Sequence, residues 1–364
     1  MRQMLREDNL KEPDKALVRG GRTNFGGERV SSAPVVVVTG ASAGLGRAIA
    51  HGFAKRGAKI ALLARNPEAL QAAADECAIL GGFGLPVPTD VSDPEAVEAA
   101  AARAEAELGP IDIWVNNAMV SVFSPAKEMT AADYKRVTDV LYLGFVHGTL
   151  SALRRMLNRD RGTIVQIGSA LAYRSIPLQS AYCACKHAIN GFTDSIRCEL
   201  HHDKSHVKIT AVQMPAMNTW QFNWVKNRLP NNTQPVPPIF DPELAAEVVV
   251  EAGLAASPRR EYWVGTPTVA AIVGQKFVPG LLDRYLGATG YKSQQIEGEP
   301  KDPDAPNNLY EYVPGTHSAR GKFDKRMKRT SFEVFLTLHR NWMMLGLGAL
   351  AAVGGATLAS RRRS

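Results

Sequence analysis

Short apolar segments alternate with amphipathic segments from residue 35 to residue 264. Residues 35–39 are apolar up to the final threonine, which is typical of a strand buried on both faces of a parallel sheet. Further strands are predicted at residues 59–64, 84–88, 111–115, 164–168, 207–212 and 261–264, and helices at residues 45–56, 67–80, 93–108, 131–158 and 180–202. This alternation predicts an α/β fold: a doubly wound parallel sheet of seven strands with helices on both faces.

The segments outside this alternation differ from it in composition. Residues 1–33 are polar and aperiodic, which predicts a flexible N-terminal arm before a globular domain at residues 34–265. Residues 266–290 are mostly apolar and predict a helical extension, whereas residues 291–330 are rich in proline and then basic, as in a linker. A tail at residues 331–364 completes the chain.

The tail contains a hydrophobic segment, residues 341–360, without a charged side chain. As a helix this segment would span about 30 Å, close to the hydrocarbon thickness of a bilayer. Trp342 and the basic residues Arg340 and 361–363 flank it, as at membrane interfaces. We expect a transmembrane or membrane-associated helix that anchors the protein with its globular domain in the cytoplasm. The alternative is a soluble helix packed on a partner subunit of a homo-oligomer.

The net charge of +8 comes from residues 318–364, which hold ten basic and two acidic side chains. The rest of the chain is neutral and offers no basic groove, so we expect no nucleic-acid partner. The four cysteines fit a reducing compartment. Cys183 and Cys185 diverge on a predicted helix, so we expect no metal site.

A glycine-rich turn, TGASAGLG at residues 39–46, links the first predicted strand to the first predicted helix. Gly40 permits a tight turn, Gly44 lets the backbone approach a phosphate group, and Gly46 lets the helix pack on the strand. The helix N-terminus supplies free N–H groups and the positive end of the helix dipole. The turn therefore predicts a dinucleotide site with contacts from Thr39, Gly40, Ser42, Ala43, Gly44, Leu45 and Gly46.

Ser169, Tyr182 and Lys186 form a candidate set for proton transfer. Ser169 follows a predicted strand, and Tyr182 and Lys186 lie four residues apart on one face of a predicted helix. A nearby ammonium group favours the phenolate and lowers the pKa of a phenol from its ordinary value of about 10. Tyr-x-x-x-Lys alone also fits a surface tyrosine beside a solvated lysine, but the order of strand, glycine turn and strand-end serine favours catalysis.

With these motifs in this order, the chain resembles the short-chain dehydrogenases/reductases, which are single-domain Rossmann-type oxidoreductases. The resemblance extends from about residue 33 to about residue 265. It implies an NAD(P)-dependent enzyme that interconverts an alcohol and a ketone or aldehyde. Tyr182 would transfer the proton, Ser169 would orient the carbonyl, and Lys186 would lower the pKa of Tyr182 and hold the ribose. The resemblance also places these residues at the cofactor: Asp90, Val91, Asn117, Ala118, Pro215 and Thr219, besides Tyr182 and Lys186.

The choice of cofactor depends on the end of the second strand, where NAD enzymes usually carry an acid that binds the ribose 2′-hydroxyl. Here Ala64 occupies that position and Arg65 follows it, which suits a 2′-phosphate. A solvated surface arginine is the alternative interpretation. We therefore expect NADP(H), with NAD(H) as the second candidate.

The insert at residues 214–241 carries Trp220, Phe222 and Trp224. The resemblance implies that this segment covers the substrate, so we expect an apolar, lipid-like small molecule; packing of these aromatic side chains in the core is the alternative. Leu141 stands where the family usually has an asparagine that completes a water relay. This departure keeps a second hypothesis open: an NADP(H)-binding sensor or partner-binding protein with little turnover.

Overall fold

The computed structural model describes residues 33–340. The predicted N-terminal arm, apart from its last residue, and the predicted helix at 341–360 lie outside the described residues. Within residues 33–340, no helix has the length and apolar character needed to cross a bilayer.

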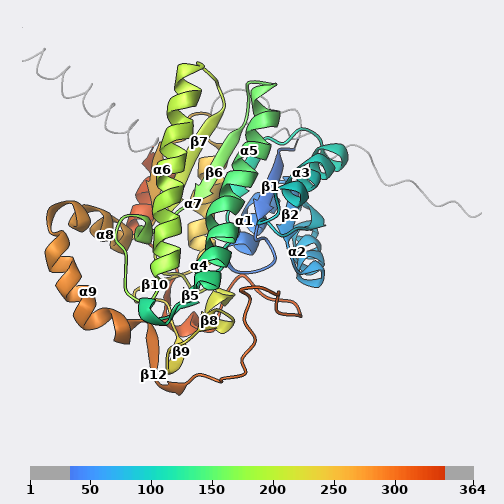
Figure 1. Ribbon diagram of the computed structural model, residues 1–364. Helices are drawn as coiled ribbons and strands as arrows, with labels where there is room; N and C mark the ends of the chain where they lie inside the picture. The colour runs from blue at the N-terminus through green and yellow to red at the C-terminus, as the bar shows by residue number, and fades with distance from the viewer. Residues whose placement is uncertain (1–32, 341–364) are drawn as a thin grey trace, which may run out of the picture. The chain divides into compact units, whose positions relative to one another are not determined.

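A seven-stranded parallel sheet forms the centre of the fold (Figure 1). Its strands lie in the order β11-β7-β6-β4-β1-β2-β3, so the chain starts in the middle and winds outward in both directions. Their bounds are β1 Val35–Thr39, β2 Lys59–Ala64, β3 Phe83–Pro88, β4 Ile113–Asn116, β6 Thr163–Ile167, β7 Lys208–Gln213 and β11 Glu261–Trp263. The predicted fold class is confirmed, and each strand boundary lies within two residues of its expected position.

Two helical layers cover the sheet because the side chains of each strand alternate between its faces. In β1, Val35 and Val37 belong to one apolar core, and Val36 and Val38 belong to the other. The first core includes side chains of α3 (Pro94–Leu108), α5 (Gly144–Leu157) and α6 (Ser180–His202). The second includes side chains of α1 (Gly44–Ala54), α2 (Pro67–Ile79) and α7 (Pro242–Leu254).

The helix predicted at residues 131–158 is not continuous. It consists of α4 (Ala131–Val137), a π-helical segment η2 (Thr138–Leu143) and α5. Val137, Leu141 and Phe145 are four residues apart and all belong to the same apolar core. The spacing of buried positions therefore stays helical through the π-helical segment, which is why the sequence pattern does not reveal it.

The expected extension is helical, and parts of the expected linker form short strands. Residues 266–290 form α8 (Thr266–Phe277) and most of α9 (Pro279–Ser293). Within residues 291–330, two short strands pair with the insert that precedes them: β12 (Gln295–Pro300) with β9 (Asn231–Thr233), and β13 (Met327–Lys328) with β10 (Ile239–Phe240). A further short pair joins β5 (Val122–Phe123) to β8 (Lys226–Asn227). These pairings join segments far apart in the chain, so local composition gives no sign of them.

Candidate active site

A cavity of about 410 Å³ lies at the carboxyl ends of the central strands, where open α/β sheets bind their ligands. It brings together residues from every motif that the sequence analysis singled out. The predicted residues that line it are Gly40, Ser42, Ala43, Gly44, Leu45, Gly46, Arg65, Asp90, Val91, Asn117, Ala118, Ser169, Tyr182, Lys186, Pro215 and Thr219. Thr39 is not among these lining residues, and its contact with a cofactor stays a prediction.

Thr39 is buried behind the cavity wall. Its hydroxyl accepts hydrogen bonds from the backbone N–H of Asn117 (2.8 Å) and of Ala118 (3.0 Å). It therefore joins the end of β1 to the segment after β4. Asn116 also has a structural role: its buried side-chain amide donates hydrogen bonds to the side-chain oxygens of Thr149 and Gln166 at 3.0 Å each.

The glycine turn forms a close-packed cradle at the start of α1. A Cβ on Gly46 would lie 2.1 Å from the carbonyl oxygen of Gly40, so no larger residue fits there. Gly40 has φ +68°, in the left-handed region that favours glycine. Ala43 precedes α1 and gives it no side-chain cap. The start of α1 thus has no capping side chain, and the N–H of its first residue, Gly44, donates to the backbone carbonyl oxygen of Ser318 at 3.1 Å.

Ser169, Tyr182 and Lys186 converge from β6 and α6. Ser169 follows the last residues of β6, and its backbone N–H donates to the side-chain oxygen of Gln213 at 2.7 Å. Lys186 is buried, and its Nζ donates to the carbonyl oxygen of Ile167 at 2.6 Å. The same Nζ lies 5.6 Å from the centroid of the Tyr182 ring. The three side chains therefore line one cavity, as expected from the sequence.

The pKa directions differ from the expectation of a lowered tyrosine pKa. Burial raises the pKa of Tyr182, and an interaction with the Ser169 hydroxyl only opposes this rise. Burial also lowers the pKa of Lys186 to about 7. Desolvation disfavours the charged form of each group, and near neutral pH only part of the Lys186 population carries the charge that would favour phenolate.

This shift makes stability depend on pH. In the unfolded chain Lys186 titrates near its ordinary pKa of 10.5, whereas in the folded protein it titrates near 7. Between these values the unfolded state binds more protons, so the free energy of unfolding rises with pH through this window. We expect Lys186→Met to remove a rise of roughly 3–5 kcal/mol between pH 7 and pH 10.5. Urea unfolding of both proteins across this range measures it; parallel curves would contradict the assignment.

Leu141 lies in η2 and is fully buried in the apolar core. Its side chain can neither donate nor accept a hydrogen bond, as the sequence indicated. The π-helical turn around it changes the backbone hydrogen-bonding pattern next to α6, because such turns bond residues five apart.

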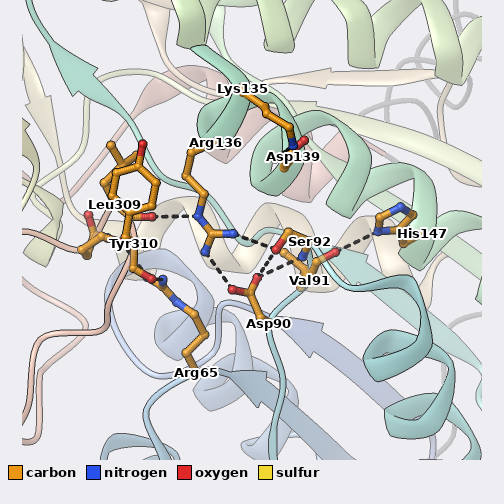
Figure 2. Close-up of polar contacts among 11 residues, drawn as sticks. Arg65, Asp90, Val91, Ser92, Lys135, Arg136, Asp139, His147, Leu309 and Tyr310 are labelled. Carbon is orange, nitrogen blue, oxygen red and sulfur yellow. Dashed lines mark hydrogen bonds and ion pairs between the residues drawn. The ribbon is translucent and has the colours of Figure 1, made fainter. Parts of the chain in front are cut away.

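A second polar cluster surrounds Arg65 and Asp90 (Figure 2). Arg65 follows β2, and its guanidinium donates to the carbonyl oxygens of Asn308 (2.6 Å) and Tyr310 (2.7 Å). Asp90 accepts from Arg136 and from the Ser92 hydroxyl at 2.7 and 2.8 Å. Burial opposes ionisation of Asp90, but these hydrogen bonds keep its pKa below the ordinary value.

Sequence reasoning missed Arg136 and the segment near residue 310. Arg136 lies on α4 and also donates to the carbonyl oxygen of Leu309 at 3.0 Å (Figure 2). An arginine in a predicted helix is ordinarily interpreted as a solvent-exposed side chain. Its partner on the segment near residue 310 is a backbone carbonyl oxygen, which every residue type possesses, so no sequence signal marked this contact.

The aromatic residues of the insert line the same cavity. Trp220 and Trp224 lie edge to face, with ring centroids 6.3 Å apart. Phe222 packs in the same manner against Phe123, with ring centroids 6.1 Å apart. All three residues therefore line the cavity and also pack on other aromatic side chains, so the two interpretations of the sequence do not exclude each other.

Comparisons with known proteins agree with this geometry. The family model for short chain dehydrogenases matches residues 34–228. The chain is 35% identical over 303 residues to an uncharacterized oxidoreductase, YxnA, of Bacillus subtilis (strain 168), a match that covers 82% of this chain and 83% of the relative. It is 37% identical over 170 residues to human dehydrogenase/reductase SDR family member 7, covering 46% of this chain and 50% of the relative.

Solved structures show the same similarity. A metagenomic short-chain oxidoreductase in complex with NADP superposes with a TM-score of 0.54 at 29% identity, over 64% of this chain and 97% of the other. A short-chain dehydrogenase from Streptomyces avermitilis superposes with a TM-score of 0.59 at 25% identity, over 71% of this chain and 98% of the other.

Proposed function

Because the chain belongs to the short-chain dehydrogenase/reductase family and is therefore an NAD(P)-dependent oxidoreductase, we propose that it uses NADP(H) to interconvert an apolar alcohol and its ketone or aldehyde. The observation that supports this most strongly is the shared cavity. The glycine turn, Arg65 and the set of Ser169, Tyr182 and Lys186 all line it.

The preference for NADP(H) is supported by charge at the end of β2. Ala64 offers no carboxylate for a ribose 2′-hydroxyl, and the neighbouring Arg65 lines the cavity with a guanidinium that suits a phosphate. The similar metagenomic oxidoreductase was solved in complex with NADP. NAD(H) is the second candidate.

The proposed chemistry assigns one task to each polar side chain. The bound nicotinamide cofactor supplies or accepts the hydride. The Tyr182 hydroxyl donates a proton to the carbonyl oxygen in reduction and accepts it back in oxidation. The Ser169 hydroxyl donates a hydrogen bond to the same oxygen and orients it. Lys186, anchored on Ile167 at 2.6 Å, holds a positive charge beside Tyr182 when protonated.

An apolar substrate is supported by apolar side chains that line the cavity besides the glycine turn. Pockets of this kind bind apolar ligands and use a few polar groups to orient them. The apolar lining residues there are Leu171, Ile176, Trp220, Phe222, Trp224, Pro235, Val236 and Leu286.

A panel of carbonyl compounds tests this function. We expect NADPH oxidation with a kcat/KM at least about tenfold higher for bulky apolar ketones than for small polar ones, because burying apolar surface contributes about 25 cal/mol per Å². Trp224→Ala should reduce this preference, since it removes an apolar wall. Preference for small polar carbonyls would contradict the substrate class. Tight NADPH binding without turnover on any compound would favour the sensor hypothesis that Leu141 left open.

A further inference from the structure

A segment of the predicted linker, residues 308–318, lies across the cofactor end of the cavity. We call it the strap. It follows β12 and has no helix or strand of its own. In Figure 2 its residues Leu309 and Tyr310 lie beside Arg136 and next to the guanidinium of Arg65. The strap is therefore held by contacts with the domain and not by its own secondary structure.

On one side, the strap binds the nucleotide-facing end of the sheet. Arg65 holds its start through the carbonyl oxygens of residues 308 and 310. Asn66 donates to the carbonyl oxygens of Val313 (3.1 Å) and Gly315 (3.0 Å). Further along, the backbone N–H of Gly44 donates to Ser318 at 3.1 Å, and Arg47 donates to the carbonyl oxygen of His317. Every acceptor in this set is a backbone carbonyl oxygen.

On its other side, the strap packs on the aromatic segment that covers the substrate end. The His317 ring lies 4.6 Å from the centroid of the Trp224 ring and 5.4 Å from that of Trp220. The backbone N–H of Asn308 donates to the carbonyl oxygen of Trp224 at 3.0 Å. One segment thus contacts the glycine turn and the aromatic cover together.

The strap leaves the cavity open beneath it. Asn308, Tyr312, Val313 and His317 line the same space of about 410 Å³ as the glycine turn and Tyr182. A segment that filled the site would remove this space, whereas a segment that roofs it contributes lining residues. The strap therefore covers the cavity and does not fill it.

We propose that the strap is part of the cofactor site: it closes over bound NADP(H), holds it in place, and couples its release to movement of the aromatic cover. This inference rests on the proposed function. Cofactor exchange then requires the carbonyl hydrogen bonds of the strap to break, as in enzymes where opening of a covering loop limits release.

Gly315→Ala tests the proposal without removing a side chain from the site. Gly315 has φ +92°, so alanine strains the closed strap even though the nearest atom to a new Cβ is 3.9 Å away. We expect NADPH to dissociate about five- to tenfold faster from this variant than from the wild type, measured by stopped-flow displacement. Gly298→Ala is the matched control: it has φ +77° and open space, but lies in β12, outside the strap. Its dissociation rate should equal that of the wild type.

Hydrogen exchange on the unmodified full-length protein gives an independent measurement. Saturating NADPH should slow the exchange of amides in residues 308–318 and leave those in β12 unchanged. If Gly315→Ala accelerates NADPH association and leaves dissociation unchanged, the strap competes with the cofactor and the proposal is wrong. It is also wrong if rates and exchange do not change while NADPH binds. A wild-type protein that binds neither NADPH nor NADH would overturn the proposed function itself, and the strap proposal with it.

Discussion

Tyr182→Phe is expected to lower kcat for carbonyl reduction by about a thousandfold while leaving the Kd for NADPH within about threefold of the wild type. The substitution removes only the phenolic oxygen from a side chain that lines the cavity. Phenylalanine cannot transfer a proton to the developing alkoxide, but it preserves the ring beside Lys186. Steady-state NADPH oxidation and fluorescence titration with NADPH separate the two effects.

Tyr134→Phe is the matched control for this experiment. The Tyr134 hydroxyl forms a hydrogen bond with the hydroxyl of Ser180, the first residue of α6, at 2.7 Å, and it does not line the cavity. Removal of this oxygen tests whether any lost hydroxyl near α6 slows the enzyme. A Tyr182→Phe variant that retains more than about a tenth of wild-type kcat would exclude this tyrosine as the main proton donor.

Arg65→Glu is expected to lower the ratio of kcat/KM for NADPH to kcat/KM for NADH by about two orders of magnitude. The change replaces a guanidinium that can bind a 2′-phosphate with a carboxylate that repels it and accepts from a ribose hydroxyl. Arg65 also holds the strap through Asn308 and Tyr310, so we expect both kcat/KM values to fall. The ratio of the two kcat/KM values isolates the effect of the 2′-phosphate contact, because loosening of the strap affects both cofactors alike.

The control for the change in net charge is Arg103→Glu. Arg103 lies exposed on α3, where it bonds Glu107 at 2.7 Å, and it is not part of the cavity. Parallel steady-state kinetics with both dinucleotides should leave its cofactor preference at the wild-type value. An Arg65→Glu variant with that same preference would show that Arg65 serves only to anchor the strap.

Local patterns predicted the sheet because each strand carries its own signal. The valines of β1 are buried on both faces, and a run of this kind predicts a central parallel strand. The glycine turn is equally local: the close approach of Gly46 to Gly40 excludes any side chain. The helical spacing of Tyr182 and Lys186 placed both on one face of α6. In each case the cause lies within a few residues of the feature.

Other properties of the site depend on atoms that are distant in sequence. The pKa of Lys186 falls to about 7 because packing removes water from its ammonium group. The residues next to it in the sequence do not predict that it is buried. The π-helical turn at Leu141 preserves the apolar spacing on either side, so its pattern resembles an ordinary helix.

By itself, the sequence determined the order of strands and helices, the glycine turn and the position of the serine, tyrosine and lysine, since these follow from side-chain identity and short-range geometry. Only the tertiary structure decided that residues 295–300 and 327–328 pair with the insert and that the strap contacts Arg65 and Asn66. The physical reason is the nature of the contacts. Arg65 and Asn66 bind backbone carbonyl oxygens more than 240 positions away, and such acceptors are the same in every residue.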